Sequence, residues 1–224
     1  MNNIEKAIEQ YCDLNLTNEN NWYNWSIDMN NLPEQINISD GNNYEQNIQL
    51  KQDLNKLWAK TNNQEEKENL IKYYIKDWGG IRTNRPETIK KYTASTAEEL
   101  INTLGKRGIA SWSKALVVKD FENYAIFDAR VSISLNCIQI LHKKKDIVLF
   151  PILSSRNNVI KRGNDQLKIL ARNYNWTKVS ENNFYMQYID ILKSVAKAKE
   201  TNISTIEMLL FAKAEELVLE TFFN

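Results

Sequence analysis

Residues 104–117 read Leu-Gly-Lys-Arg-Gly-Ile-Ala-Ser-Trp-Ser-Lys-Ala-Leu-Val, and this stretch predicts a tight glycine turn between two helices. The first helix is expected over residues 96–104, because Ser95 or Thr96 can serve as its N-cap and its large apolar side chains share one face. Gly105 is expected to end that helix, since glycine readily adopts the backbone conformation that follows a helix C-terminus.

The turn carries groups that suit a phosphate. Gly108 permits a close backbone turn, and Ser111 can cap the second helix. Such a hairpin points backbone N–H groups and a helix N-terminus outward, and both favour an anion. The hairpin residues expected to bind such a phosphate are Gly105, Lys106, Arg107, Gly108, Ala110 and Ser111.

A single acidic residue stands at the start of the next predicted helix. Residues 124–127 are short and apolar, and Asp128 follows where a helix over residues 129–141 should begin. Asp128 can cap that helix, whose dipole favours a charged carboxylate. Asp120 and Glu122 are the nearest other acids, but they lie in a polar connector where we expect solvation. Asp128 is therefore either a helix cap alone or a catalytic carboxylate as well.

The hairpin and the following aspartate resemble the helix-hairpin-helix (HhH-GPD) DNA glycosylase superfamily. Hairpins of that family end Gly-Ile-Gly, and the matching positions are Gly108, Ile109 and Ala110, with alanine in place of the second glycine. The family's catalytic aspartate follows a short loop and corresponds to Asp128. The resemblance implies an all-α, two-lobed glycosylase fold that binds duplex DNA and acts on a base flipped out of it.

The same resemblance bears on the mechanism. Bifunctional family members carry a Schiff-base lysine four residues after the first hairpin glycine, and that position is Trp112 here. Members with tryptophan at that site act on alkylated bases and use only the aspartate and a water. Lys114 lies two residues further on, so it would be a nucleophile only in a bifunctional enzyme with an insertion in the hairpin. Ser113-Lys114 and Asp128-Ala-Arg-Val also resemble compact bacterial relatives.

Composition narrows the class of protein. Two cysteines, Cys12 and Cys137, and the single histidine, His142, are too few soft ligands for a zinc or iron–sulfur site, so no metal and no cofactor is expected. The start of the chain lacks the features of a signal peptide, and no stretch approaches the length of a membrane span. We expect a cytoplasmic, monomeric protein with free thiols and no membrane partner.

Net charge is only +1, but it is unevenly distributed. Residues 1–75 hold 6 basic against 12 acidic residues, whereas residues 76–119 hold 9 against 4 and residues 141–178 hold 9 against 2. Positive charge therefore gathers around the hairpin and after the helix of residues 129–141. This pattern favours a DNA-facing side, although solvated basic helix faces remain an alternative.

Apolar periodicity predicts helices along most of the chain, with no repeat and no convincing linker. Outside the stretch already described, they are expected over residues 3–14, 45–60, 64–78, 86–92, 159–174, 182–199 and 204–223. Residues 147–153 suggest either a buried extended piece or a bend. We expect a single domain over residues 1–224, with a hairpin core at about 64–142 and a flanking helical lobe from residues 1–63 and 146–224.

Several aromatic residues are candidates for the base pocket or for a wedge into the duplex. They also have a simpler interpretation, since aromatic side chains commonly pin loops onto a core. The candidates are Trp22, Trp25, Trp78, Trp112 and Tyr124.

The expected function is hydrolysis of the N-glycosidic bond of a damaged or modified base in double-stranded DNA, which leaves an abasic site. The context would be base excision repair or defence against phage DNA with modified bases. The enzyme is expected to be monofunctional. A noncatalytic helix-hairpin-helix DNA-binding module and a purely structural helical adaptor are the alternatives.

Overall fold

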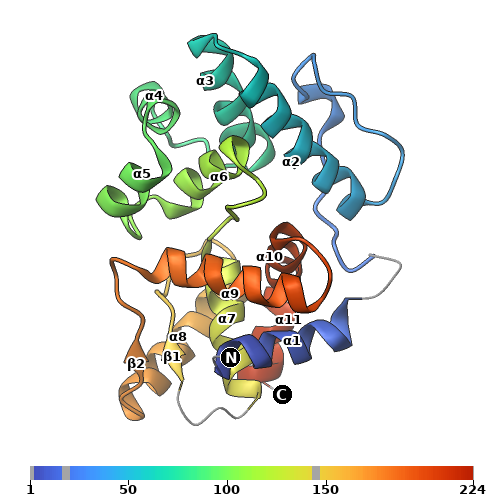
Figure 1. Ribbon diagram of the computed structural model, residues 1–224. Helices are drawn as coiled ribbons and strands as arrows, with labels where there is room; N and C mark the ends of the chain where they lie inside the picture. The colour runs from blue at the N-terminus through green and yellow to red at the C-terminus, as the bar shows by residue number, and fades with distance from the viewer. Residues whose placement is uncertain (1–2, 17–20, 143–146, 224) are drawn as a thin grey trace. The chain divides into compact units, whose positions relative to one another are not determined.

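The computed structural model describes residues 3–16, 21–142 and 147–223, and these residues are mostly helical (Figure 1). Their only β-structure is two strands of two residues each, so the expected all-α class is confirmed. The chain divides into two compact units. We call Glu19–Ile126 the hairpin unit, and Met1–Asn18 together with Phe127–Asn224 the aspartate unit.

The hairpin unit is built around helix α6 (Ile109–Lys119), whose residues 111–118 are all buried. Neighbouring helices surround it and leave it almost no solvent face. They are α2 (Asn43–Lys60), α3 (Gln64–Lys72), the π-helical turn η2 (Tyr73–Trp78), α4 (Pro86–Ala94) and α5 (Ala97–Leu104), and a short 3-10 turn, η1 (Met29–Asn31), precedes them.

The helices of this unit begin close to the residues predicted from their N-cap signals. The Thr96 side chain accepts a hydrogen bond from the N–H of Glu99, and the Glu99 carboxylate accepts one from the N–H of Thr96. This capping box selects Thr96, not Ser95, as the N-cap of α5. Asn42 and Glu45 form a second box that starts α2, and Pro86 starts α4.

The helix expected over residues 64–78 is regular only as far as Lys72. Its last six residues form the π turn η2, in which Trp78 stacks on Tyr74 with ring centres 4.3 Å apart. The Trp78 indole N–H donates to Asn47 Oδ1 at 2.8 Å. Asn47 belongs to the neighbouring helix α2, so this contact at the π turn is one that local sequence patterns do not predict.

The aspartate unit is built in the same way around helix α7 (Ala129–Leu141), whose residues 131–139 are buried. Four helices pack against α7, and a fifth, α9, covers two of them. The elements of this unit are α1 (Asn3–Asn15), β1 (Val148–Leu149), α8 (Asn158–Asn173), β2 (Thr177–Lys178), α9 (Phe184–Ala198), α10 (Ile203–Ala212) and α11 (Ala214–Phe222).

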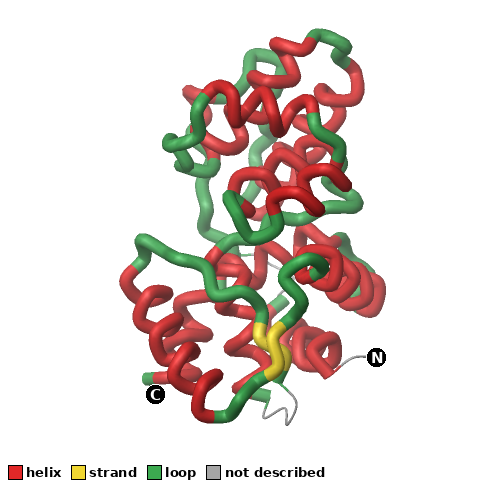
Figure 2. Tube along the Cα trace, turned by 90° about the vertical axis from the view of Figure 1, so that its left-hand side faces the viewer, coloured by secondary structure: helices red, strands yellow, loops and turns green. Residues whose placement is uncertain are grey.

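Two amide side chains of α7 hold the extended segment that follows it. Asn136 Oδ1 accepts from the N–H of Phe150 at 2.9 Å, and Gln139 both accepts from and donates to the backbone of Val148 at 3.0 Å. Buried amides are thus satisfied by the backbone of residues 148–150. This segment forms β1, which pairs in parallel with β2 beside the helices (Figure 2), so the extended interpretation of residues 147–153 is confirmed for Val148–Leu149.

One expectation about this unit needs correction, and another falls outside the described residues. The single helix expected over residues 204–223 is broken at Lys213 into α10 and α11. The break has a packing reason, because α10 packs on α9 whereas α11 packs on α8, and both also cover α7. Lys143, Lys144 and Lys145, which contribute to the second basic segment, lie outside the described residues.

The two units have bounds other than those of the expected core and flanking lobe. The segment before residue 64 belongs with the hairpin, because α2 packs directly on α6. Conversely, α7 belongs with both ends of the chain, because α1, α10 and α11 pack on it. Among the described residues, no helix is both long enough and apolar enough to cross a membrane.

Candidate functional site

Two glycines with positive φ shape the hairpin between α5 and α6. Gly105 ends α5 with φ 48°, and Gly108 precedes α6 with φ 67° in the left-handed region. A Cβ at Gly108 would also lie 3.1 Å from the Tyr92 hydroxyl oxygen. Both positions therefore require glycine for the turn that the sequence predicts.

The first turn of α6 presents backbone donors that the hairpin itself does not use. Within the described parts of the chain, no acceptor is found for the N–H groups of Gly108, Ile109 and Ala110. Lys106 and Arg107 lie beside them with exposed side chains. Free N–H groups at a helix N-terminus next to two cations form a suitable site for a phosphate.

Ser111 does not cap α6, contrary to expectation. The left-handed Gly108 starts the helix earlier, so Ser111 lies inside its first turn and its N–H donates to the Gly108 carbonyl at 2.9 Å. The Ser111 hydroxyl instead accepts a hydrogen bond of 2.8 Å from the Asn84 amide. This bond ties the loop of residues 81–85 to the start of α6.

Sequence patterns did not assign that loop to the hairpin. Arg82 and Arg85 flank Asn84, and both side chains are exposed. The loop therefore adds two cations next to the hairpin. The signal in the sequence was its basic composition, but only the Asn84–Ser111 bond shows where it lies.

Trp112 and Lys114 both point into the core of the hairpin unit. Trp112 is fully buried, and its indole N–H donates to the Gly105 carbonyl at 3.1 Å, which braces the turn. Lys114 is 5% exposed and donates from Nζ to the Ala110 carbonyl at 2.9 Å. A Cβ at Gly79 would lie 2.7 Å from Lys114 Cε, so that glycine makes room for the lysine.

The other aromatic candidates pack on one another and on their neighbours in the hairpin unit. Trp25 lies 6.0 Å from Trp78, and Trp22 lies 5.3 Å from Tyr44, in both cases between ring centres. These pairs fix the segment that precedes α2 against α2 and η2. Tyr124 is half-buried in the connector, and burial raises the pKa of its phenol.

Asp128 caps α7 with one of its two carboxylate oxygens. Oδ1 accepts hydrogen bonds from the N–H groups of Arg130 at 2.9 Å and Val131 at 3.0 Å. None of the described residues donates a hydrogen bond to Oδ2, and the side chain is partly exposed. The predicted cap is confirmed, and the second oxygen is available to a water or a sugar.

Phe127, the residue before Asp128, packs in a buried aromatic cluster that includes a titratable phenol. The Phe127 ring packs edge-on against Tyr188, with ring centres 5.0 Å apart, and both side chains are fully buried. Burial raises the pKa of Tyr188 well above its usual value, and the charges of Glu207 and Asp128 raise it further. Glu207 is itself only 2% exposed on α10. Glu207 and Asp128 therefore both act on the same buried phenol, that of Tyr188.

Glu207 was not identified from the sequence. A signal was present, since Glu207 falls between Ile203 and Leu210 on the buried face of its helix, where charged residues are rare. Helical periodicity places it on that face but does not show that α10 packs on α7. The link to Asp128 depends on that packing.

Arg130, two residues after Asp128, pairs with another acid. Its Nη2 lies 2.6 Å from Glu215 Oε1, which also accepts a 3.0 Å hydrogen bond from the Asn157 amide. Asn157 caps α8, so this network joins the starts of α7, α8 and α11. Arg130 thus holds the helices around Asp128 in place.

Asp120, the other acid considered from the sequence, has both carboxylate oxygens hydrogen-bonded to a residue three positions away. Its Oδ1 and Oδ2 accept hydrogen bonds from the backbone and side-chain nitrogens of Asn123, at 3.1 and 2.9 Å. Asp128 differs from it in leaving one oxygen without a donor among the described residues.

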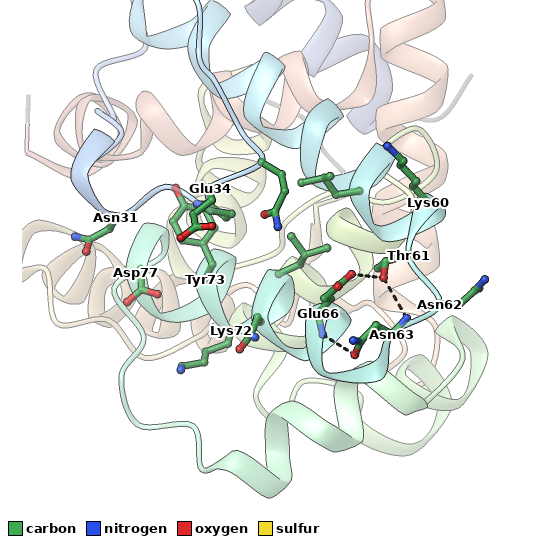
Figure 3. Close-up of a pocket in the computed structure, with 15 residues that line it drawn as sticks. Asn31, Glu34, Lys60, Thr61, Asn62, Asn63, Glu66, Lys72, Tyr73 and Asp77 are labelled. Atoms are coloured by element: carbon green, nitrogen blue, oxygen red, sulfur yellow. Dashed lines mark hydrogen bonds between the residues drawn. The ribbon is translucent and has the colours of Figure 1, made fainter.

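A separate cavity of about 740 Å³ lies in the hairpin unit between the 31–35 loop, α2 and α3 (Figure 3). Leu57, Leu70 and Tyr73 contribute to its wall, and Glu66 bonds to Thr61 and to Asn63 at its edge. None of the predicted site residues lines it.

The described residues contain no cluster of three or more His, Cys, Asp or Glu side chains that could hold a metal ion. Comparison of the chain with protein-family models, with curated proteins and with solved structures finds no match. Any assignment of function therefore rests on the geometry of the two units.

Proposed function

We propose that this protein is a DNA glycosylase of the helix-hairpin-helix type, which removes a damaged or modified base flipped out of duplex DNA. The observation that carries the proposal is that the two carboxylate oxygens of Asp128 have different surroundings. One oxygen is fixed by two backbone N–H groups, and no described residue donates to the other. A carboxylate held in this way is oriented before any substrate arrives.

The chemistry needs one carboxylate and one water. As the bond between C1′ and the base nitrogen breaks, its electron pair leaves with the base and the sugar gains oxocarbenium character. The negative charge of Asp128 stabilises that cation, and Oδ2 accepts a proton from the water whose oxygen bonds to C1′. The proton then passes to the departing base, and an abasic site remains. The buried Phe127 and Tyr188 rings limit screening of this charge by water from below.

The hairpin unit supplies the grip on DNA in this proposal. The free N–H groups of residues 108–110 and the exposed Lys106 and Arg107 suit a phosphodiester of the backbone. Such contacts position the duplex without reading its sequence. The substrate would then be selected by the flipped base alone.

The buried position of Lys114 favours the water-dependent, monofunctional reaction. An amine that attacks the sugar must reach it, whereas Lys114 is 5% exposed and bonded to the Ala110 carbonyl. Borohydride should therefore trap no covalent complex between the protein and its DNA substrate. A trapped complex that disappears in Lys114→Ala would assign the lyase mechanism instead.

The second candidate is a noncatalytic helix-hairpin-helix module, and the cap made by Asp128 is the observation that favours it. A cap alone explains the hydrogen bonds to Oδ1. It does not require that the carboxylate be partly exposed or that one of its oxygens lack a donor among the described residues.

The deciding experiment incubates the protein and its Asp128→Asn variant with genomic DNAs of different modification status. These include alkylated DNA and phage DNA with substituted cytosines, so that repair and defence substrates are tested together. Abasic sites are counted with an aldehyde-reactive probe. Asparagine caps a helix as well as aspartate does, so the variant changes the charge and keeps the cap.

We expect abasic sites in one class of DNA and a loss of about 10³-fold in their rate of formation with Asp128→Asn. Salt-dependent DNA binding should remain in the variant. Binding with no abasic sites in any DNA would support the noncatalytic module.

A further inference from the structure

Helix α8 of the aspartate unit has one face whose side chains are exposed in the described part of the chain. Its opposite face packs on α7 and α11, so closely at Gly163 that a Cβ there would lie 2.8 Å from Ile133 Cδ1. Lys161, Lys168 and Arg172 are exposed and follow one another at seven and four residues, which places them in a row on the outer face. The row is about 16 Å long at 1.5 Å per residue.

Little within the helix neutralises this row. Asp165 is the acid on the same face, and it pairs with Lys168 at 2.9 Å, with both side chains 57% exposed. Lys161 and Arg172 remain as two exposed cations at the ends of the row. An exposed row of this kind attracts a polyanion.

A stacked aromatic pair follows the last cation of the row in sequence. Tyr174 and Trp176 stack with their planes 13° apart and their ring centres 6.0 Å apart, and Tyr174 is 68% exposed. Asn175 between them has a φ of 50°, a left-handed conformation that asparagine tolerates and that lets both rings project to one side. Hydrogen bonds from the N–H groups of Tyr174 and Trp176 into the last turn of α8 fix this arrangement.

The pair does not belong to the core of the aspartate unit. Tyr174 follows α8 and is exposed, Trp176 precedes β2 and is half-buried, and Ile169 on the last turns of α8 is 51% exposed. A stacked ring pair with one ring exposed and one half-buried, together with a nearby row of cations, provides the two features that bind single-stranded nucleic acid. Cations follow the backbone, while unpaired bases stack on the rings.

We propose that the outer face of α8 and the Tyr174–Trp176 pair form a binding surface for single-stranded nucleic acid. The occupant is single-stranded because stacking needs a base with a free face, which an intact duplex does not offer. The row matches about five stacked nucleotides at 3.4 Å each. This surface belongs to the aspartate unit, is distinct from the hairpin, and does not depend on the proposed glycosylase activity.

The test measures affinity for an oligothymidylate of about ten nucleotides by fluorescence anisotropy at several salt concentrations. Tyr174→Ala/Trp176→Ala should weaken binding by roughly tenfold or more, whereas Tyr174→Phe/Trp176→Phe keeps both rings and should bind like the wild type. These side chains are at the surface, so the fold of the unit should survive, and circular dichroism checks it.

The contribution of the cations on α8 is measured by the salt dependence of the affinity. Lys161→Gln/Arg172→Gln should reduce the slope of log affinity against log salt by about 1.4, which corresponds to two phosphate contacts on a single strand. Lys193→Gln/Lys197→Gln removes the same charge from exposed positions of α9 in the same unit and should leave the slope unchanged. If both charge variants reduced this slope equally, the salt dependence would come from the net charge of the protein and not from this row, and the proposal would be overturned.

Failure of this surface and failure of the glycosylase are distinguishable. The ring variant should keep duplex binding and abasic-site formation, and Lys106→Gln/Arg107→Gln should weaken duplex binding while keeping oligothymidylate binding. Unchanged oligothymidylate affinity in Tyr174→Ala/Trp176→Ala would refute the single-strand surface, whatever the abasic-site assay shows.

Discussion

Asp128 uses its two carboxylate oxygens differently. Oδ1 stabilises the start of α7 through two backbone N–H groups, and Oδ2 has no donor among the described residues. The structural role and the proposed catalytic role therefore belong to different atoms of one residue. Substitutions can separate them.

Asp128→Asn should leave the stability of the protein nearly unchanged, whereas Asp128→Ala should lower its free energy of unfolding by about 1 kcal/mol. The reason is that asparagine still accepts the two N–H groups and alanine does not. Urea unfolding followed by circular dichroism measures both. Equal destabilisation by the two substitutions would mean that the charge of Asp128, not its cap, stabilises the fold.

At the scale of the element, the hairpin depends on a backbone conformation that glycine allows. Gly108 turns the chain with φ 67° and so exposes the first N–H groups of α6. Gly80 has nearly the same φ, 65°, but no atom lies within 4 Å of an added Cβ there. The two glycines form a matched pair for testing the hairpin.

Gly108→Ala and Gly80→Ala should each destabilise the protein by about 1–2 kcal/mol, because alanine is strained in the left-handed region. Only Gly108→Ala should also weaken duplex binding, since it displaces Tyr92 and the donors of the hairpin. Urea unfolding and anisotropy with a labelled duplex measure the two effects. A parallel loss of DNA affinity in Gly80→Ala would show that strain, not hairpin geometry, controls binding.

Lys119 gives the hairpin unit a pH dependence. Its ammonium joins α6 to the end of α4 through the carbonyls of Thr93 and Ser95, at 3.1 and 2.6 Å. Burial, and then the charge of Lys67, lower the pKa of Lys119 to about 8, against the opposing effect of Glu99. A lysine whose pKa is lowered by folding destabilises the fold while it is protonated in both states.

The free energy of unfolding of the wild type should therefore rise, relative to that of Lys119→Met, as the pH increases from about 8 to about 10.5. In this window the folded state has lost the proton and the unfolded state still holds it. Urea unfolding of both proteins across the window gives the difference. A difference that is flat or falls with pH would show that the pKa is not lowered.

Most elements near the site could be predicted from local sequence, because their causes are local. The Thr96 and Asp128 side chains cap N–H groups within three residues of themselves, and Gly105 ends its helix through its own backbone conformation. The burial of Lys114, the π turn at residues 73–78 and the position of Glu207 depend on partners far along the chain. Periodicity contains no information about those partners.

At the scale of the whole molecule, each unit encloses one helix that is buried nearly all round. These are α6 in the hairpin unit and α7 in the aspartate unit. The sequence predicted both helices, but not that α1 at the start of the chain would cover α7. Such a pairing depends on long-range packing, for which local patterns give no register.

Both cysteines lie in the aspartate unit, so thiol labelling should report on that unit alone. Cys12 and Cys137 are almost fully buried, and burial raises the pKa of each thiol to about 12. Labelling by a disulfide reagent at neutral pH should be slow in the native protein, faster in Asp128→Ala, and unchanged in Gly108→Ala. Equal acceleration in the two variants would show that the units unfold together.

If Asp128 supports cleavage of a glycosidic bond, the reaction releases a free base, and this release can be measured directly. Wild-type protein and Asp128→Asn are incubated with the DNA that gives abasic sites, and small molecules in the filtrate are identified by mass spectrometry. We expect the wild type to release one free base in amounts equal to the abasic sites, and the variant to release almost none. Equal release by both proteins, or abasic sites with no free base, would contradict it.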